Sequence, residues 1–154
     1  MEMEYSLFCL DIEENEILKT CRELGIAITA YSPIGRGILT GTLRSQSDLP
    51  ENDLRRFLPK YSEQNFTAVN KMIYVLDKIR DERYGPDIPS LAQIALAWLL
   101  AQGDDIVPIP GTKRMERIDE NLKAADFLLH EREVMQLREA AESVDIVGTR
   151  YPEA

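Results

Sequence analysis

The sequence is poor in the residues that mark several common kinds of protein site. Its 154 residues include one histidine and two cysteines, Cys9 and Cys21, whose spacing fits no metal-ligand motif. We therefore expect reduced thiols in an intracellular protein. No apolar run reaches the roughly 18 residues that a membrane-spanning helix needs, and Met1–Glu4 is unlike the start of a signal peptide. These absences predict a soluble cytoplasmic protein without a metal site.

Positive charge is also scarce. Lys and Arg total 18 against 27 Asp and Glu, so the formal net charge is −9. This balance argues against nucleic acid or an anionic membrane as the partner. The length and the apolar content are those of one globular domain, residues 1–154. In such an acidic chain, the cluster Lys113, Arg114 and Arg117 stands out.

That cluster lies in the stretch Ile106–Asn121, which we interpret as a short buried strand, a Pro110-Gly111 turn and a helix. A helix N-terminus presents free backbone N–H groups and favours negative charge. Lys113 and Arg117 are four residues apart, so one helical face would bring both to the same anion. The stretch therefore predicts a phosphate site.

The chain before this stretch predicts a parallel βαβ unit. Met3–Phe8 and Ile26–Tyr31 have the composition of strands, and we expect the second to be buried on both faces. Between them we expect one helix, opened by a capping box at Asp11 and Glu14 and ended by Gly25. Its expected apolar stripe is Ile17, Leu18, Cys21 and Leu24. A buried strand so close to Met1 suggests that further chain precedes it.

The remainder is a long polar segment followed by helices. Thr42–Asn65 is expected to be a lid, a binding loop or partly disordered, anchored by Leu54, Phe57 and Leu58. The expected helices are Phe66–Arg83 (ended by Gly85 and Pro86), Leu91–Ala101 (opened by a Ser90–Gln93 capping box and followed by Gly103) and Glu131–Ser143. The order β-α-β-loop-α-α-β-α-α is an α/β fold with three parallel strands, too few to close a barrel.

Two of the three strands are followed by Gly/Pro-rich loops that carry cations, Tyr31–Gly37 and Pro110–Arg117. Parallel α/β folds bind ligands at the carboxyl ends of their strands, and many TIM barrels bind phosphate in the loops after the last two. Glu120 and Asn121 offer an acceptor and an amide suited to adenine, and Tyr31 could stack on a nicotinamide ring.

Each residue taken alone has an ordinary alternative. Lys113 and Arg114 could be a solvated helix start, and Glu120 could be a surface salt-bridge partner. Tyr31 could be an aromatic at the edge of the core, and Gly111 a turn glycine. Their combined spacing is what favours a ligand.

Several segments resemble the aldo-keto reductase family, in the family's order and over nearly the whole chain. These segments are Glu4–Ser6, Cys21–Ile26, Ala30–Gly41, Ala95–Leu100, Ile109–Arg114 and Glu120–Leu122. The resemblance is to the microbial and plant reductases, which include pyridoxal-reductase-like enzymes. It implies the C-terminal half of a (β/α)8 barrel, strands six to eight, and hence a partial NADP-dependent oxidoreductase domain over residues 1–154.

The resemblance also implies a cofactor, NADPH, which reduces an aldehyde or ketone. The implied cofactor-binding residues are Tyr31 at the nicotinamide; Ser32, Pro33, Ile34 and Arg36 along the pyrophosphate; Gly111, Thr112, Lys113 and Arg117 around the 2′-phosphate and ribose; and Glu120 and Asn121 at the adenine. In the long loop, Arg55 or Arg56 could add a cation.

The departures from the family limit the expected activity. The catalytic tetrad of Asp, Tyr, Lys and His belongs to the first half of the barrel, and none of the four is expected in this chain. His130 is expected to be structural, at the start of the last helix. Glu2 stands where many relatives have a Gln that binds the nicotinamide amide.

Three hypotheses follow. The chain is part of an NADPH-dependent reductase that acts on a small-molecule carbonyl substrate once an N-terminal half completes it. Alternatively, it is a non-catalytic fragment that binds NADP(H), pairs with another half-barrel or self-associates through its exposed barrel edges. A third hypothesis is a nucleotide- or phosphate-binding module without redox chemistry.

Overall fold

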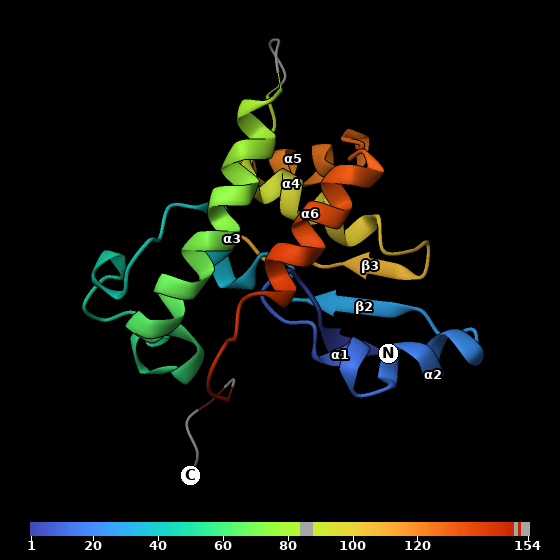
Figure 1. Ribbon diagram of the computed structural model, residues 1–154, viewed down its shortest axis with the longest axis horizontal. Helices are drawn as coiled ribbons and strands as arrows, with labels where there is room; N and C mark the ends of the chain where they lie inside the picture. The colour runs from blue at the N-terminus through green and yellow to red at the C-terminus, as the bar shows by residue number, and fades with distance from the viewer. Residues whose placement is uncertain (84–87, 150, 152–154) are drawn as a thin grey trace.

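The computed structural model describes residues 1–83, 88–149 and 151. It contains a parallel three-stranded sheet in the order β1 (Glu2–Glu4), β2 (Ile28–Tyr31), β3 (Ile106–Pro108), which lies on one side of the molecule (Figure 1). Met3 lies opposite Ala30, and Thr29 lies opposite Val107. The predicted α/β class with three parallel strands is confirmed.

The first strand is shorter than predicted. It ends at Glu4, and Ser6 and Cys9 then close a tight turn by exchanging backbone hydrogen bonds of 3.1 and 2.9 Å. The prediction of a strand up to Phe8 was wrong because this apolar run enters the core as a turn instead of pairing in the sheet. Tyr5, Leu7 and Phe8 are all buried there.

The predicted helix after this turn is two helices, α1 (Asp11–Glu14) and α2 (Ile17–Glu23). Glu16 separates them because its φ of 64° is left-handed, which a continuing helix cannot accommodate. The predicted capping box was wrong, since Asp11 is already helical and Leu10 occupies the N-cap without a side-chain hydrogen bond. Gly25, at φ 66°, follows the end of α2 as predicted.

The apolar stripe and the second strand are only partly as predicted. In α2, Leu18 and Cys21 are buried, but Leu24 is 68% exposed. Burial alternates along β2, with Ile28 and Ala30 buried and the residues between and after them half-buried. The prediction of burial on both faces was wrong because the face of β2 that carries Thr29 and Tyr31 is only partly covered.

The segment from residue 35 to residue 61 consists of short 3₁₀ turns, η1 (Gly35–Thr40), η2 (Gln46–Asp48), η3 (Leu54–Phe57) and η4 (Pro59–Tyr61). Leu54 and Phe57 are 66% and 67% exposed, so the prediction that they anchor this segment was wrong. Leu58 is buried as expected, and Leu49 and Tyr61 are buried with it.

Four longer helices complete the fold: α3 (Glu63–Asp81), α4 (Leu91–Leu100), α5 (Met115–Leu122) and α6 (Glu131–Glu142). Helix α3 begins three residues earlier than predicted, because the Ser62 hydroxyl accepts the Asn65 N–H and caps it. The Ser90–Gln93 capping box of α4 is confirmed by both of its hydrogen bonds. The expected stop at 85–86 lies outside the described residues.

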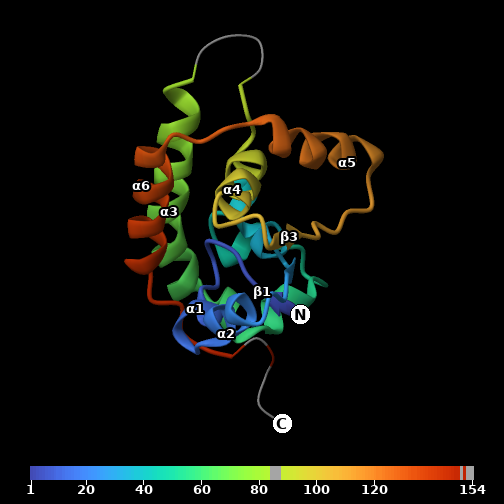
Figure 2. The same cartoon turned by 90° about the vertical axis from the view of Figure 1, so that its right-hand side faces the viewer.

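Helices α3 and α6 lie side by side, and α4 lies between them and the sheet (Figures 1 and 2). The Trp98 indole N–H of α4 donates to the Val134 carbonyl of α6 at 3.2 Å. The same ring meets Tyr5 edge-on, with centroids 6.1 Å apart. Within the described residues, no helix has the length and apolar character needed to cross a membrane.

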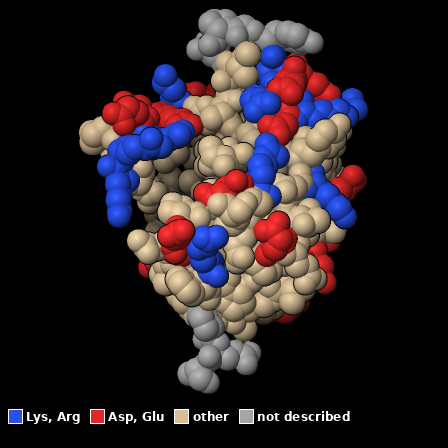
Figure 3. Space-filling view, turned by 90° about the vertical axis from the view of Figure 1, so that its left-hand side faces the viewer, with Lys and Arg blue, Asp and Glu red and all other residues tan. Residues whose placement is uncertain are grey.

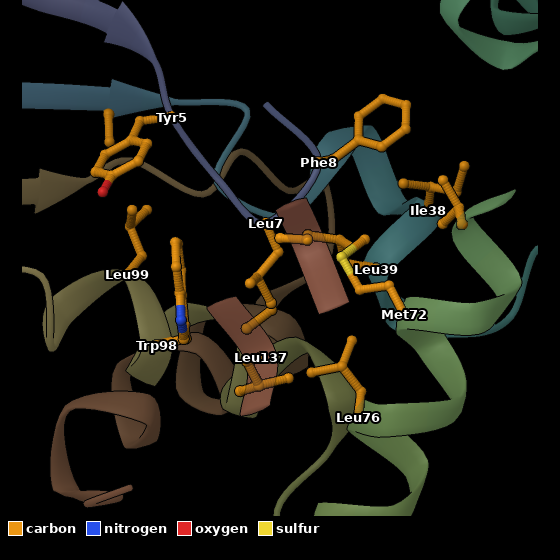
Figure 4. Close-up of a cluster of buried hydrophobic side chains, with 14 of the residues drawn as sticks. Tyr5, Leu7, Phe8, Ile38, Leu39, Met72, Leu76, Trp98, Leu99 and Leu137 are labelled. Atoms are coloured by element: carbon orange, nitrogen blue, oxygen red, sulfur yellow. The ribbon is translucent and has the colours of Figure 1, made fainter. Parts of the chain in front are cut away.

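Figure 4 shows where the core lies. Apolar side chains from the turn after β1, from η1 and from α3, α4 and α6 converge on one another. The labelled members are Tyr5, Leu7, Phe8, Ile38, Leu39, Met72, Leu76, Trp98, Leu99 and Leu137. This packing holds η1, and with it the loop that follows β2, against the helices.

Candidate functional site

The two loops predicted to share a ligand leave the sheet at the same edge. Strands β2 and β3 are parallel neighbours, so Tyr31 and Pro108 end them side by side. The N–H of Ile109 still donates to the Ala30 carbonyl at 3.0 Å, which keeps the second loop beside the first as it departs. Both cation-bearing segments therefore start from the same carboxyl edge of the sheet.

The first loop, residues 32–37, is a tight and conformationally unusual turn. Ser32 and Arg36 both have φ of 50°, although neither is glycine, and such residues cost free energy unless their surroundings hold them. Gly35 and Gly37 also have positive φ, and the N–H of Gly35 donates to the Ser32 carbonyl at 2.8 Å. Pro33 is buried, which fixes the loop to the core.

Arg36 is held at both its backbone and its side chain. Its carbonyl oxygen accepts a 2.6 Å hydrogen bond from Arg55 Nη1. Its guanidinium carbon lies 5.5 Å from the centre of the Tyr151 ring, and its Nη2 donates to the Tyr151 hydroxyl at 3.3 Å. A ligand phosphate at this position would meet a cation that already has an aromatic partner.

Arg55, one of the two candidate cations in the long loop from Thr42 to Asn65, is held by contacts within the protein. Arg55 Nε and Nη2 donate to the Asp53 carboxylate at 2.9 and 2.7 Å, while Nη1 donates to Arg36 as described. Hydrogen bonding from Arg55 keeps the pKa of Asp53 below its ordinary value, although partial burial opposes this. Of the pair considered from sequence, Arg56 thus remains the better candidate for a ligand contact.

The second loop differs from the predicted helix start. Helix α5 begins at Met115, with Arg114 as its N-cap in an extended conformation (φ −122°, ψ 130°). Lys113 therefore precedes the helix, so placing it with Arg117 on one helical face was wrong. The Pro-Gly turn delays the helix, and the Thr112 hydroxyl accepts the Arg114 N–H at 3.2 Å. Residues 111–114 are all exposed.

Arg117 and Glu120 form an ion pair with each other, so the salt-bridge alternative for Glu120 is confirmed. Burial disfavours the charged form of Glu120. Hydrogen bonds from Ser90 and Arg117, with the charges of Arg117 and Arg114, nevertheless hold its pKa below the ordinary value. The Glu120 backbone carbonyl accepts a 3.0 Å hydrogen bond from Gln93 Nε2, which ties α5 to α4.

Asn121 faces an apolar cavity of about 320 Å³ between α4, β3 and α5. Its walls are Leu96, Leu100, Pro108, Pro110, Ile118, Leu122, Ala124 and Ala125. Among these walls, Ile118 and Leu122 are 41% and 68% exposed. An apolar surface of this kind is typical of a face that another part of a protein covers.

The three structural residues that sequence reasoning missed are Asp53, Asn65 and Tyr151. Each acts through a contact distant in sequence or through its local turn, and no motif marks them.

His130 is at the N-cap of α6, where its backbone N–H donates to the Glu133 carboxylate at 2.7 Å, in keeping with a structural role. On the face in Figure 3, cationic and anionic side chains are interspersed. No group of three or more His, Cys, Asp or Glu able to hold a metal exists in residues 1–83, 88–149 and 151.

Comparisons with known proteins give the family. Residues 1–142 match the model of the "Aldo/keto reductase family". An NADP(+) aldo-keto reductase of Schizosaccharomyces pombe is 44% identical over 154 residues, covering 99% of this chain and 44% of that protein. A candidate pyridoxal reductase of Saccharomyces cerevisiae is 36% identical over 162 residues, covering 98% of this chain and 46% of that protein. The chain thus spans less than half the length of these relatives.

Solved structures show the same relationship. A thermostable aldo-keto reductase crystallised with the inhibitor epalrestat is 29% identical, with a TM-score of 0.63 over 90% of this chain and 38% of its own. A glycerol dehydrogenase from Gluconobacter oxydans shares the fold, with a TM-score of 0.79 at 22% identity. The match covers 96% of this chain and 43% of that protein. These neighbours are TIM barrels, and the α/β sheet described above is consistent with a part of one. The chain belongs to the aldo/keto reductase family.

Proposed function

We propose that this chain is the cofactor-binding half of an NADPH-dependent reductase that converts an aldehyde or ketone to an alcohol. Its three strands correspond to strands six to eight of the barrel. The observation that carries the proposal is the shared carboxyl edge of β2 and β3, from which both cation-bearing loops depart. The family and the NADP(+) in the name of the fission-yeast relative support the choice of cofactor.

The residues at this edge fit a dinucleotide. Around Gly111 no atom lies within 4 Å of the position that a Cβ would take, so a phosphate or ribose has room to approach the backbone. Lys113 is exposed beside it and supplies the charge for a 2′-phosphate. Tyr31 is half-buried at the end of β2, where its ring would lie against the nicotinamide. NADPH, when bound, would supply the hydride.

The remaining predicted contacts take supporting roles. Ser32, Pro33, Ile34 and Arg36 border the pyrophosphate, and Thr112 shapes the turn before α5. Arg117 reaches the 2′-phosphate only by sharing its guanidinium with Glu120, so Lys113 is the principal cation. Glu120 and Asn121 remain the residues nearest the adenine.

We place the catalytic Asp, Tyr, Lys and His outside residues 1–154, so activity requires a second half-barrel. The apolar cavity beneath α5 and the exposed Val107 and Ile109 on β3 and after it support docking of that half. The same surface favours the alternative of a non-catalytic fragment that pairs or self-associates. We also infer a cytoplasmic location from the family and from the two free thiols.

Complementation tests this proposal. The 154-residue chain is co-expressed with the N-terminal portion of the fission-yeast relative, and NADPH oxidation is followed with a panel of aldehydes and ketones. We expect activity only when both pieces are present. A complex that forms and binds NADPH without turnover would favour the non-catalytic fragment. Binding of inorganic phosphate as tightly as NADPH would favour the phosphate module.

A further inference from the structure

In the turn that follows β1, a buried thiol faces a buried lysine amine from η4. Lys60, in η4, is 9% exposed, and Cys9, in the turn after β1, is 4% exposed. Lys60 Nζ lies 3.6 Å from Cys9 Sγ, although 51 residues separate them. Among the described residues, the carboxylate nearest to the amine is that of Asp11, which is 3.9 Å away and mostly solvated. The fold therefore keeps an amine and a sulfur in contact at low exposure.

The pair lines a cavity that a small reagent can enter. This cavity has a volume of about 300 Å³, and its walls are the segment from Leu7 to Asp11 with Glu14, Lys60, and residues from the end of α6 onward. A water molecule takes about 30 Å³ of liquid volume, and hydrogen peroxide is only slightly larger than water. The cavity beside Cys9 and Lys60 is therefore large enough to hold a peroxide molecule.

We propose that Cys9 and Lys60 form a site of covalent modification, a sulfur–nitrogen bridge made when hydrogen peroxide oxidises the thiol. In the first step peroxide transfers one oxygen to sulfur, which gives a sulfenic acid and one water; sulfur loses two electrons and peroxide gains them. In the second step the Lys60 amine, once it has released its extra proton to solvent, attacks that sulfur. The S–N bond forms, the S–O bond breaks, and the oxygen leaves as water with one amine proton.

The surroundings determine how fast each step proceeds. Burial raises the pKa of the Cys9 thiol to about 11. The backbone hydrogen bond from Asp11 and the charge of Lys60 oppose this increase, and the charge of Glu4 adds to it. The thiol is therefore largely protonated at neutral pH, and its oxidation is slow. Once a sulfenic acid forms, the adjacent amine competes with any second peroxide molecule because it is already in contact. The bridge thus protects Cys9 from irreversible oxidation. It does not depend on the proposed function.

Peptide mapping of the whole chain by mass spectrometry, after graded peroxide treatment, tests the proposal. We expect a linked pair of peptides carrying Cys9 and Lys60, with the summed mass less two hydrogen atoms. Dithiothreitol should separate them again. Cys21 is the internal control, since it is also a buried, free cysteine. Oxidation of Cys9 to sulfinic acid with no linked peptide would overturn the proposal, as would an equally abundant link at Cys21.

Variants identify the amine. Lys60→Arg keeps the charge but removes the nucleophile, so the link should disappear and dimedone labelling of Cys9 sulfenic acid should rise several-fold. Cys9→Ser should abolish the link, and Cys21→Ser should leave it unchanged. A link that persists in Lys60→Arg would overturn the assignment to Lys60. If that variant fails to fold, the wild-type peptide map still decides between a bridge and simple over-oxidation.

Discussion

Arg55 Nη1 donates a 2.6 Å hydrogen bond to the backbone carbonyl of Arg36, which joins the long loop after η1 to the turn that follows β2. Because Arg36 has the left-handed φ of 50°, the turn needs contacts that hold it. Arg55 is itself fixed by the Asp53 carboxylate. The loop predicted to be a lid or a binding loop therefore supports the turn that follows β2.

Replacing Arg55 tests this support. Arg55→Ala removes charge-assisted hydrogen bonds to Asp53 and to the Arg36 carbonyl, and we expect a loss of about 1–3 kcal/mol in the free energy of unfolding. Arg56→Ala is the matched control, because it deletes the same side chain one residue later. Urea denaturation measures both. Equal losses in the two variants would contradict the supporting role of Arg55.

Alanine substitutions at Gly35 and Gly111 distinguish an effect on stability from an effect on ligand binding. A Cβ on Gly35 would lie 2.8 Å from Ile38 Cγ2 at a φ of +56°, so Gly35→Ala should destabilise the chain by about 1–3 kcal/mol. A Cβ on Gly111 meets no atom within 4 Å, so Gly111→Ala should change stability by less than about 0.5 kcal/mol. It should nonetheless weaken NADPH binding, since the methyl group occupies the space for the ligand. Thermal unfolding measures stability, and calorimetric titration measures NADPH affinity. An unchanged NADPH affinity in Gly111→Ala would exclude close approach of the cofactor to the Gly111 backbone.

Glu120 should contribute to stability in a pH-dependent way. Its pKa is lowered in the folded state, so its contribution is present above the unfolded value of about 4.3 and is lost as the pH falls through the folded value. Glu120→Gln should therefore cost up to about 1 kcal/mol at neutral pH and nothing in strong acid. Glu116→Gln, exposed in the same helix, is the control. Urea unfolding between about pH 2 and pH 7 measures this. A constant difference across that range would refute the linkage.

Asn65 holds the segment around Val147, which follows α6, to the start of α3. Its side chain is fully buried, donates to the Val147 carbonyl at 2.8 Å and accepts the Val147 N–H at 3.1 Å. Asn65→Ala leaves both backbone groups without these partners, so we expect a loss of about 2–4 kcal/mol. The control Asn52→Ala, at an exposed position, should leave the free energy of unfolding unchanged. Amide hydrogen exchange at Val147 should accelerate in the first variant alone; unchanged protection would show that other contacts hold this segment.

Local patterns were predictable where one physical effect determines the structure. The capping box of α4 needs only Ser90 and Gln93, and the end of α2 needs only Gly25. Both are confirmed, as is the parallel order of the strands. Strand β1 was misjudged because burial of Tyr5 depends on Trp98, which lies far along the chain.

The candidate site was predictable as a pair of loops but not in its details. The start of α5 depends on how far the Pro110-Gly111 turn delays the helix, and that moved Lys113 off the helix. The ion pair between Arg117 and Glu120 competes with the ligand roles assigned to both. The contact of Tyr151 with Arg36 spans 115 residues, so no local pattern indicates it.

The central claim is that the carboxyl edge of β2 and β3 binds NADPH and recognises its 2′-phosphate through Lys113. Isothermal titration of the chain with NADPH and with NADH tests it most directly. We expect NADPH to bind more tightly by about 1–3 kcal/mol, the value of a charge-assisted contact. Lys113→Ala should remove most of that difference, while Lys71→Ala, at an exposed position on α3, should keep it. Equal affinities for the two cofactors, or no binding of NADPH, would contradict the claim.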